Sequence, residues 1–236
     1  RFGTSKQLLN FTGKSLLRHI TDEATQHADH QVTVVLGAGY QTVQSELTGS
    51  PATKIVNADW QKGMSSSISF GLQSLLQASP HLEHCIIAVC DQPFINAHVF
   101  EGLKSRAKQN GKGIIVTGFA DTWGVPVLFS KKYFQELLSL DGPQGAKKVV
   151  KNHLEDMAIF PYDRARIDID TKDDYYRLEH SMVSTVEAQE IISFHLPQPT
   201  KSINVPLHDA VGYTLATDVI APYAIPNFAQ SSMDGY

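Results

Sequence analysis

The sequence predicts an α/β fold in which a mostly parallel sheet carries helices on both faces, followed by a small α+β tail. Short, continuous apolar runs alternate along the chain with segments in which apolar residues recur every three or four positions. Such alternation of strand and helix is typical of a parallel sheet. Near residue 180 the pattern changes to a short, Pro-rich stretch, which indicates a second part of the chain.

The predicted strands are apolar runs of four to six residues. Runs of this length without regular polar alternation suit strands that are buried on both faces. They cover residues 32–36, 85–90, 113–117 and 126–129.

The predicted helices lie before and between these runs. Met64, Ile68 and Leu72 recur at a spacing of four and therefore share one helix face. Asn96 is the candidate N-cap of a later helix, because its side-chain oxygen can accept a bond from a first-turn N–H. The predicted helices cover residues 14–28, 64–78, 96–109 and 130–139.

Composition excludes several classes of protein. The chain of 236 residues has 24 acidic and 20 basic side chains, a net charge of −4, which argues against a nucleic-acid-binding surface. No apolar run of about 18 residues occurs, so we expect no membrane partner. The two cysteines, Cys85 and Cys90, lie in one apolar run and are interpreted as reduced thiols of a cytoplasmic protein.

The sequence also indicates how the chain ends and where its two parts meet. The chain starts at Arg1 rather than Met and stops at Tyr236 after a Met-Asp-Gly turn, so we interpret it as a fragment cut at both ends. We place the domain boundary at 180–183, between a first domain of residues 1–180 and a tail of residues 184–236. About 50 residues are too few for a large independent core.

Two loops contain residue types that suit phosphate. Arg1 and Lys6 flank a loop that contains Gly3, and backbone N–H groups with a cation can bind an anion; a surface loop with two solvated cations is the other interpretation. Gly63 precedes three Ser at the start of a predicted helix. Their hydroxyls can cap the helix, and the N–H groups of the first turn are free donors because they have no partner within the helix. Plain capping needs only one Ser.

Carboxylates mark two further positions. Asp91 follows the predicted strand 85–90, at the end where open α/β sheets place ligands. It is a candidate Mg²⁺ ligand, or alternatively a cap of the next helix. Asp168 and Asp170 would share one face of a strand at 167–169 and could supply a second carboxylate. Thr171 with Asp173 and Asp174 also fits a helix cap with helix-start charges.

Taken in order, five motifs resemble the molybdenum cofactor cytidylyltransferases, which belong to the MobA-like nucleotidyltransferases. These motifs are Arg-Phe-Gly-x-x-Lys-Gln-Leu-Leu, Gly-Lys-x-Leu-Leu, Asn-x-x-Trp-x-x-Gly-Met-Ser-Ser-Ser-Ile, Asp-Gln-Pro and Asp-Ile-Asp-Thr-x-x-Asp. The resemblance covers about residues 1–180. It implies a Rossmann-like α/β fold and transfer of a nucleotide monophosphate from an NTP to the phosphate of molybdopterin, with release of pyrophosphate.

The resemblance also implies roles for individual residues. Arg1, Gly3 and Lys6 would bind the triphosphate, with Arg1 and Lys6 stabilising the pyrophosphate that leaves. Asp91 would be the catalytic Mg²⁺ ligand and Asp170 the second one. The segment of Gly63, Ser65 and Ser66 would bind the nucleotide as well.

Three features bear on substrate choice. Phe2 and Gln92 look more like the cytidylyl than the guanylyl branch, so CTP is the expected nucleotide. The family's Gly-Asp-x-Gly-Ala-Arg/Lys segment has Pro143 in place of its Asp, and its Gly-Asn/His-Pro appears as Gly124-Val125-Pro126. The family's first strand and the Leu-Ala-Ala-Gly-type loop that precedes Arg-Phe-Gly are expected to be missing here.

The tail resembles the start of molybdopterin molybdenumtransferase, a family that inserts molybdate into adenylylated molybdopterin. The resemblance rests on Val205-Pro206-Leu207, Asp218-Val219-x-Ala221-Pro222 and the terminal Ser231-x-Met233-Asp234-Gly235-Tyr236. Only the opening of that family is present. The expected partners are therefore CTP and molybdopterin, with a molybdoenzyme or chaperone as acceptor of the product.

Two alternative functions stay open from the sequence. One is nucleotide transfer to another acceptor, such as a sugar phosphate or another pterin. The other is a non-catalytic module that binds cofactor and hands it to a downstream enzyme; Pro143 favours this alternative, whereas Lys6, Asp91 and Asp170 oppose it.

Overall fold

The computed structural model describes most of the first part of the chain and portions of the tail. The described residues are 5–26, 31–142, 144–169, 171, 174–175, 185, 188–189, 192–193, 202–217 and 220. The chain divides into two compact units, residues 1–188 and 189–236. The predicted boundary at 180–183 lies outside the described residues and stays a prediction.

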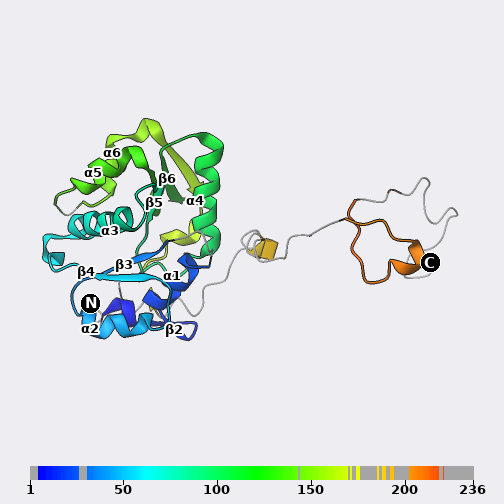
Figure 1. Cartoon of the computed structure of the whole chain (residues 1–236), viewed down its shortest axis with the longest axis horizontal. Helices are drawn as coiled ribbons and strands as arrows, with labels where there is room; N and C mark the ends of the chain where they lie inside the picture. The colour runs from blue at the N-terminus through cyan, green and yellow to red at the C-terminus, as the bar shows by residue number, and fades with distance from the viewer. Residues whose placement is uncertain are drawn as a thin grey trace, which may run out of the picture. The chain divides into compact units, whose positions relative to one another are not determined.

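The first unit is built on two sheets (Figure 1). β3 (Thr33–Leu36) and β4 (Thr53–Val56) form a parallel pair. The second sheet has the order β5-β7-β6-β8, with β5 (His84–Ile87), β6 (Ile114–Phe119), β7 (Thr122–Ser130) and β8 (Met157–Pro161). A small hairpin of β1 (Asn10–Phe11) and β2 (Lys14–Ser15) stands apart from both.

The predicted parallel sheet is confirmed with one exception. β7 runs antiparallel to both of its neighbours, β5 and β6, whereas β6 and β8 are parallel. The reason is local: only Ala120 and Asp121 separate β6 from β7, and so short a connection can join only antiparallel strands. Ala120 takes a positive φ of 47° at this turn.

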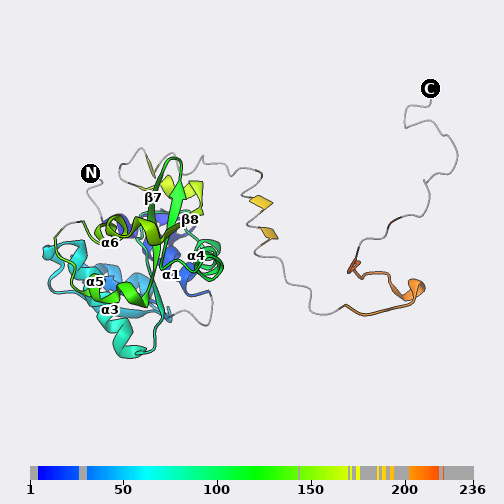
Figure 2. The same ribbon diagram turned by 90° about the horizontal axis from the view of Figure 1, so that it is seen from above.

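Helices cover both faces of the second sheet (Figure 2). On one face, Ile114 and Val116 pack in a cluster with Leu72 of α3 (Met64–Ala78) and Val149 of α6 (Lys147–Asn152); α5 (Phe134–Leu138) also contributes. On the other face, Ile115 packs with residues of α1 (Leu16–Ala24) and α4 (Ala97–Asn110). Alternate residues of β6 therefore face opposite helix layers, as strand geometry requires.

The cap predicted for α4 is confirmed. The Asn96 side chain accepts a 3.3 Å bond from the N–H of Val99, which confirms it as the N-cap of α4. Ser15 caps α1 in the same way through the N–H of Arg18 at 3.2 Å. Short helical elements complete the unit: α2 (Tyr40–Val43) and the 3-10 turns Lys6–Leu8, Gln44–Leu47, Trp60–Lys62, Lys131–Tyr133, Leu154–Asp156 and Asp163–Arg166.

Several sequence expectations need correction. β4 and β8 were not predicted. β4 (Thr-Lys-Ile-Val) is not a continuous apolar run, whereas β8 (Met-Ala-Ile-Phe-Pro) is one that the prediction missed. The strand expected at 167–169 is irregular chain that follows the turn Asp163–Arg166. The helix expected at 14–28 is shorter, because Lys14 and Ser15 pair with β1 before α1 begins.

The second unit has one described element, the 3-10 turn Leu207–Asp209. Leu207 and Val211 are 91% and 90% exposed, so the described part of the tail has not buried these apolar side chains. The expected α+β character of the tail falls largely outside the described residues. In neither unit do the described residues include a helix long and apolar enough to cross a membrane.

Candidate active site

The predicted site residues that the structure describes come from the chain that follows β4 and β5 and from the turn Lys6–Leu8. β3 and β4 are parallel, and the loop after β4 leads into α3. β5 ends at Ile87, and the chain reaches Asp91 four residues later. The carboxyl ends of parallel strands are where open α/β sheets bind ligands.

Asp91 is fixed by its own backbone. The residue is half-buried, and its carbonyl oxygen accepts a 3.0 Å hydrogen bond from the N–H of Ile169. Ile169 is fully buried beside Leu16. The bond therefore ties the chain after β5 to the stretch of residues that leads to Asp170.

The charges of Lys6 and Asp91 both influence the pKa of the Cys90 thiol. Burial, reinforced by the negative charge of Asp91 and opposed by the ammonium of Lys6, raises the pKa of Cys90 to about 11. Both charges therefore act on the same sulfur, although 85 positions separate Lys6 and Asp91 in the sequence. The candidate anion-binding cation and the candidate metal ligand therefore act on one side chain, and their binding roles stay predictions.

Neither cysteine is a candidate nucleophile. Cys85 and Cys90 are free thiols, as expected from the sequence. Burial raises the pKa of Cys85 to about 12, so at neutral pH both side chains stay protonated, and the protonated thiol is unreactive.

Gln92, the residue after Asp91, is held in place by its side chain. It is buried, and its Nε2 donates a 2.7 Å bond to the carbonyl oxygen of Ala165. Its Oε1 has no hydrogen-bond partner among the residues that the structure describes. A buried amide oxygen without a partner is unusual, and it lies one residue from the candidate metal ligand.

Asn57 organises the loop between β4 and α3. It is buried, and its Nδ2 donates to Ser66 Oγ at 3.0 Å and to Ser67 Oγ at 3.1 Å. Its Oδ1 accepts a 2.9 Å bond from the N–H of Asp59. One side chain thus joins the end of β4 to the first turn of α3.

Gly63 begins this first turn with a positive φ of 98°, a conformation that favours glycine. It is the N-cap of α3, and no side chain caps the helix there. The capping role considered for the serines is therefore not observed, and the helix start keeps uncapped N–H groups.

The hydroxyls of Ser65 and Ser66 make internal bonds instead. Ser65 is buried and donates a 2.7 Å bond to the carbonyl oxygen of Gly142, while Ser66 donates to Gly63 O at 2.9 Å. Their contact with a nucleotide stays a prediction. In this arrangement it would use the backbone N–H groups of the helix start rather than these hydroxyls.

Gly142 and Gly145 lie against the same helix start. An added Cβ at Gly145 would lie 3.1 Å from the sulfur of Met64, and Lys147 Nζ lies 5.7 Å from the centre of the Trp123 ring. No local sequence pattern predicts this contact, because Ser65 and Gly142 are 77 positions apart.

The acidic residues after position 167 differ in their surroundings. Asp168 is exposed, so its side chain is not directed into the core. Asp174 Oδ2 accepts 2.7 Å bonds from the N–H and the hydroxyl of Thr171, and the Asp174 N–H donates back to Thr171 Oγ1 at 3.2 Å. This reciprocal pattern confirms the predicted helix cap at Thr171 and Asp174.

Some predicted site residues lie outside the described part of the chain, namely Arg1, Phe2, Gly3, Pro143, Asp170 and Asp173. Within the described ranges, no group of three or more His, Cys, Asp or Glu side chains is arranged to hold a metal ion. Asp91 is therefore the described member of the predicted metal pair.

Comparisons with known proteins match each part of the chain to a family. Residues 1–157 match the MobA-like NTP transferase domain, and residues 183–236 match the MoeA N-terminal region (domain I and II). Nicotine blue oxidoreductase from Paenarthrobacter nicotinovorans is 34% identical over 89 residues, which are 37% of this chain and 41% of that protein. The match thus spans less than half of that relative's length.

Solved structures share the fold. Rv0371c from Mycobacterium tuberculosis is 28% identical with a TM-score of 0.64, covering 77% of this chain and 91% of its own. The same protein in complex with manganese gives 26% identity and a TM-score of 0.62, covering 76% and 94%. A nucleotidyl transferase from Methanothermobacter, at 19% identity and a TM-score of 0.60, covers 75% and 85% and shows the fold alone. This chain belongs to the MobA-like NTP transferase domain family, a family of nucleotidyltransferases.

Proposed function

We propose that the first unit is a divalent-metal-dependent cytidylyltransferase that transfers CMP from CTP to the phosphate of molybdopterin. The observation that carries this proposal is the position of Asp91 after β5, where its carbonyl oxygen is bonded to the N–H of Ile169, the residue before Asp170, in a chain that matches the MobA-like NTP transferase domain. Phosphoryl transfer needs a carboxylate for a metal and a cation for a phosphate, and the charges of Asp91 and Lys6 both act on the thiol of Cys90.

The donor chemistry at Asp91 fits a hard divalent cation. Mg²⁺ takes one or two carboxylates and keeps its other positions for water and substrate phosphates, so a cluster of three protein ligands is not required. Asp91 would hold the ion, and Asp170 would add the second carboxylate, since Ile169 beside it is bonded to Asp91. When bound, the ion would neutralise charge that builds on the phosphoryl oxygens.

The reaction follows from the charges. An oxygen of the acceptor phosphate forms a bond to the α-phosphorus of CTP, and the bond from that phosphorus to the β-phosphate oxygen breaks. Pyrophosphate leaves with the electron pair, and the ammonium of Lys6, together with Arg1, stabilises its negative charge. No covalent enzyme intermediate is needed, which suits a site whose thiols remain protonated.

The start of α3 would bind the nucleotide phosphates through backbone N–H groups at Gly63, Ser65 and Ser66. The segment 142–147 would contact the acceptor, because it is held against that helix start by the bond from Ser65 to Gly142. Lys147 beside Trp123 supplies a cation next to an aromatic ring, a combination suited to a phosphorylated pterin.

For the tail, we propose that residues 184–236 open a molybdenum-inserting enzyme whose remaining domains would complete its site. A carboxylate such as Asp234 has no catalytic geometry without its partner groups. Residues 1–236 should therefore produce no molybdate-dependent cofactor, and detection of such insertion by this chain would contradict the proposal.

The deciding experiment measures pyrophosphate release with CTP, molybdopterin and Mg²⁺ for the wild type and for Asp91→Asn. The amide retains the size of the side chain and removes the charge that holds the ion, so we expect turnover to fall by at least a hundredfold. The unfolding free energy should change by no more than about 1 kcal/mol, the scale of a substitution outside the core.

Asp121→Asn is the matched control, because Asp121 is exposed at the turn between β6 and β7. It should keep wild-type turnover. With GTP in place of CTP, kcat/KM should fall at least tenfold, which corresponds to about 1.4 kcal/mol. Near-normal turnover of Asp91→Asn would overturn the metal assignment, and a preference for GTP would overturn the cytidylyl assignment.

A further inference from the structure

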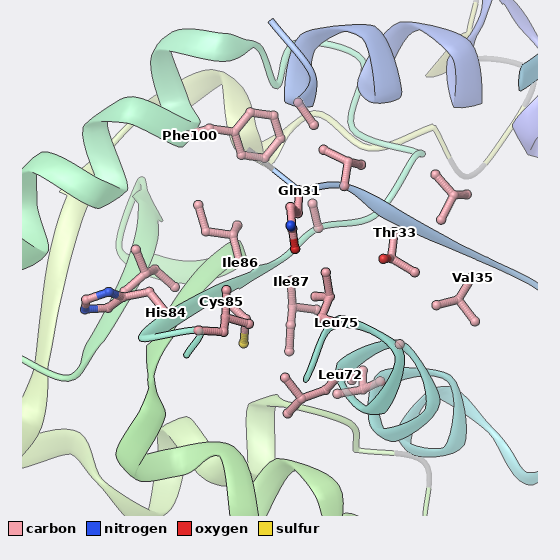
Figure 3. A pocket seen from close by; sticks show the side chains of 18 of the residues that line it. Gln31, Thr33, Val35, Leu72, Leu75, His84, Cys85, Ile86, Ile87 and Phe100 are labelled. Carbon is pink, nitrogen blue, oxygen red and sulfur yellow. The ribbon is translucent and has the colours of Figure 1, made fainter. Parts of the chain in front are cut away.

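The chain that leads from β5 to Asp91 borders a largely apolar cavity of about 1090 Å³. Figure 3 shows Leu72, Leu75 and Ile87 among the side chains that line it. Apolar side chains offer neither a donor nor an acceptor. The hydrogen bonds that position the chain at Asp91 are found on another side, in residues 162–169.

Residues 91–96, which connect Asp91 to α4, are joined to residues 162–169 by three hydrogen bonds. These bonds run from the N–H of Ile169 to Asp91 O at 3.0 Å, from Gln92 Nε2 to Ala165 O at 2.7 Å and from Tyr162 Oη to Phe94 O at 2.9 Å. The partners fall in number along the first segment, so the two segments lie antiparallel. Asp91 and Ile169, the residue before Asp170, are at one end of this pairing, and Tyr162 is at the other end.

Tyr162 is itself fixed to the second sheet. Its N–H donates a 2.7 Å bond to the carbonyl oxygen of Gly118 in β6, and its side chain is buried in the cluster that contains Ile115. Its hydroxyl also accepts a 3.5 Å bond from Asn96 Nδ2, on the residue that caps α4. The hydroxyl therefore holds residues 94–96 at a fixed place beside the sheet.

Other contacts hold the same residues against α1. His19 of α1 is bonded to the backbone of Pro93, and Glu23 Oε2 accepts a 2.9 Å bond from the N–H of Ala97. Neither of these bonds involves residues 162–169. The placement of residues 91–96 relative to the chain that leads to Asp170 therefore depends on the antiparallel pairing, whose far end is the Tyr162 hydroxyl.

This placement matters for a metal ion that two carboxylates share. Mg²⁺ requires near-octahedral geometry with oxygen ligands at about 2.0–2.1 Å, and a binding constellation has to be held to within about 0.5 Å. A segment that is fixed at both of its ends keeps its position better than one that can turn about a single bond. The bond at Asp91 fixes one end of residues 91–96, and the bond from Tyr162 fixes the other.

We propose that Tyr162 is a positioning residue of the metal site. By holding Phe94, its hydroxyl keeps residues 91–96 aligned with residues 162–169 and so sets the spacing between Asp91 and Asp170. Tyr162 acts through the backbone and does not contact the ion. The inference rests on the proposed function, because the metal site is part of that proposal.

The experiment compares Tyr162→Phe with Tyr133→Phe in the 236-residue chain. Tyr133 is the matched control, because it is buried to the same degree and its hydroxyl donates a 2.6 Å bond to Asp156 Oδ2. Asp156 precedes β8, whereas Tyr162 follows β8. Each variant thus loses one phenol hydrogen bond and keeps its ring, but at opposite ends of the sheet.

The first measurement is the binding of Mn²⁺, followed by the electron paramagnetic resonance signal of the free ion. Mn²⁺ is used in place of Mg²⁺ because it takes the same oxygen ligands. We expect Tyr162→Phe to raise the dissociation constant about tenfold, the lower end of the effect of residues that orient metal ligands. Tyr133→Phe should bind Mn²⁺ as the wild type does, and Asp91→Asn should bind it more weakly than either variant.

The second measurement is amide hydrogen exchange without metal. Exchange at the N–H of Ile169, which is bonded to Asp91 O, should be severalfold faster in Tyr162→Phe than in the wild type or in Tyr133→Phe. Exchange at the N–H of Ile115 within β6 should be equal in all three proteins and shows that each is folded.

A third measurement needs only the wild type and decides the matter if Tyr162→Phe fails to fold. Coupling between two sites is reciprocal, so an ion that depends on the pairing also stabilises it. Saturating Mg²⁺ should slow exchange at the N–H of Ile169 and at the N–H of Ala165, which donates to Tyr162 O at 3.0 Å. Unchanged exchange at both positions would contradict the coupling.

The outcomes separate this inference from the proposed function. If Asp91→Asn weakens Mn²⁺ binding but Tyr162→Phe does not, the positioning role is wrong and the metal assignment stands. If Tyr133→Phe weakens binding as much as Tyr162→Phe, the effect is a general loss of stability and the positioning role is again wrong. Equal Mn²⁺ binding by the wild type and Asp91→Asn would overturn the metal assignment and this inference with it.

Discussion

Asn57 supports the start of α3 with three hydrogen bonds, and their loss should destabilise the whole first unit. The bonds join Asn57 to Ser66, Ser67 and the N–H of Asp59 at 3.0, 3.1 and 2.9 Å. Each such bond contributes about 0.5–1.5 kcal/mol. Asn57→Ala therefore removes about 1.5–4.5 kcal/mol, and we expect about 2–4 kcal/mol, because water reaches part of the loop.

Two variants make this expectation specific. Ser67→Ala removes one of the three bonds and should cost about 1 kcal/mol. Asn152→Ala is the matched control, because Asn152 is exposed and makes a single side-chain bond, to Glu136 at 3.2 Å; it should cost less than about 0.5 kcal/mol.

The assay is urea unfolding followed by tryptophan fluorescence. The chain has two Trp, Trp60 and Trp123, and both lie in the first unit, so the signal does not depend on the tail. Two results would refute this expectation. One is an unfolding free energy of Asn57→Ala within about 0.5 kcal/mol of the wild type, which is the usual limit for a surface change. The other is a loss of unfolding free energy in Asn152→Ala as large as that in Asn57→Ala.

Other predictions concern packing and pH. An added Cβ at Gly102 would lie 2.3 Å from the Phe160 ring, so Gly102→Ala should lower the unfolding free energy by about 1–3 kcal/mol in the urea assay, whereas helix propensity alone predicts a gain of about 1 kcal/mol. Burial would raise the pKa of Asp156, but bonds from Lys132 and its other donors outweigh it and lower the pKa. The stability that Asp156 contributes is thus present above the pKa it has in the unfolded chain, and it is lost as pH falls through the pKa it has in the folded protein. Asp156→Asn should therefore make the unfolding free energy less dependent on pH below about pH 4. Burial lowers the pKa of His19 despite nearby acids, so the unfolding free energy should fall as pH drops below about 6.5, and His19→Gln should make this fall less steep. An unchanged pH dependence of the unfolding free energy in the Asp156 or the His19 variant would contradict the corresponding assignment.

The sequence by itself determined the kind of fold and the position of the candidate metal ligand. Both follow from local patterns. The apolar run 85–90 places Asp91 after a buried strand, and the structure has β5 at His84–Ile87 with Asp91 beyond it. Asn96 as a cap and the periodic face of residues 64–78 are local as well, because caps and helix faces depend on residues within one or two turns.

Only the tertiary structure decided which distant groups meet. The bond from Ser65 to Gly142 and the bond from the N–H of Ile169 to the carbonyl oxygen of Asp91 join segments that share no pattern. Their meeting depends on how helices and strands stack, which sequence periodicity does not specify.

Strand pairing is also decided by the tertiary structure. The apolar run that forms β7 looks like the runs that form β5 and β6, and its antiparallel direction follows from a two-residue connection and long-range hydrogen bonds. Among the described residues, β3 pairs with β4 and β5 pairs with β7, and these partners too are set by the neighbouring strands. A strand's own residues set which face is apolar, whereas its hydrogen-bond partners are chosen by the rest of the fold.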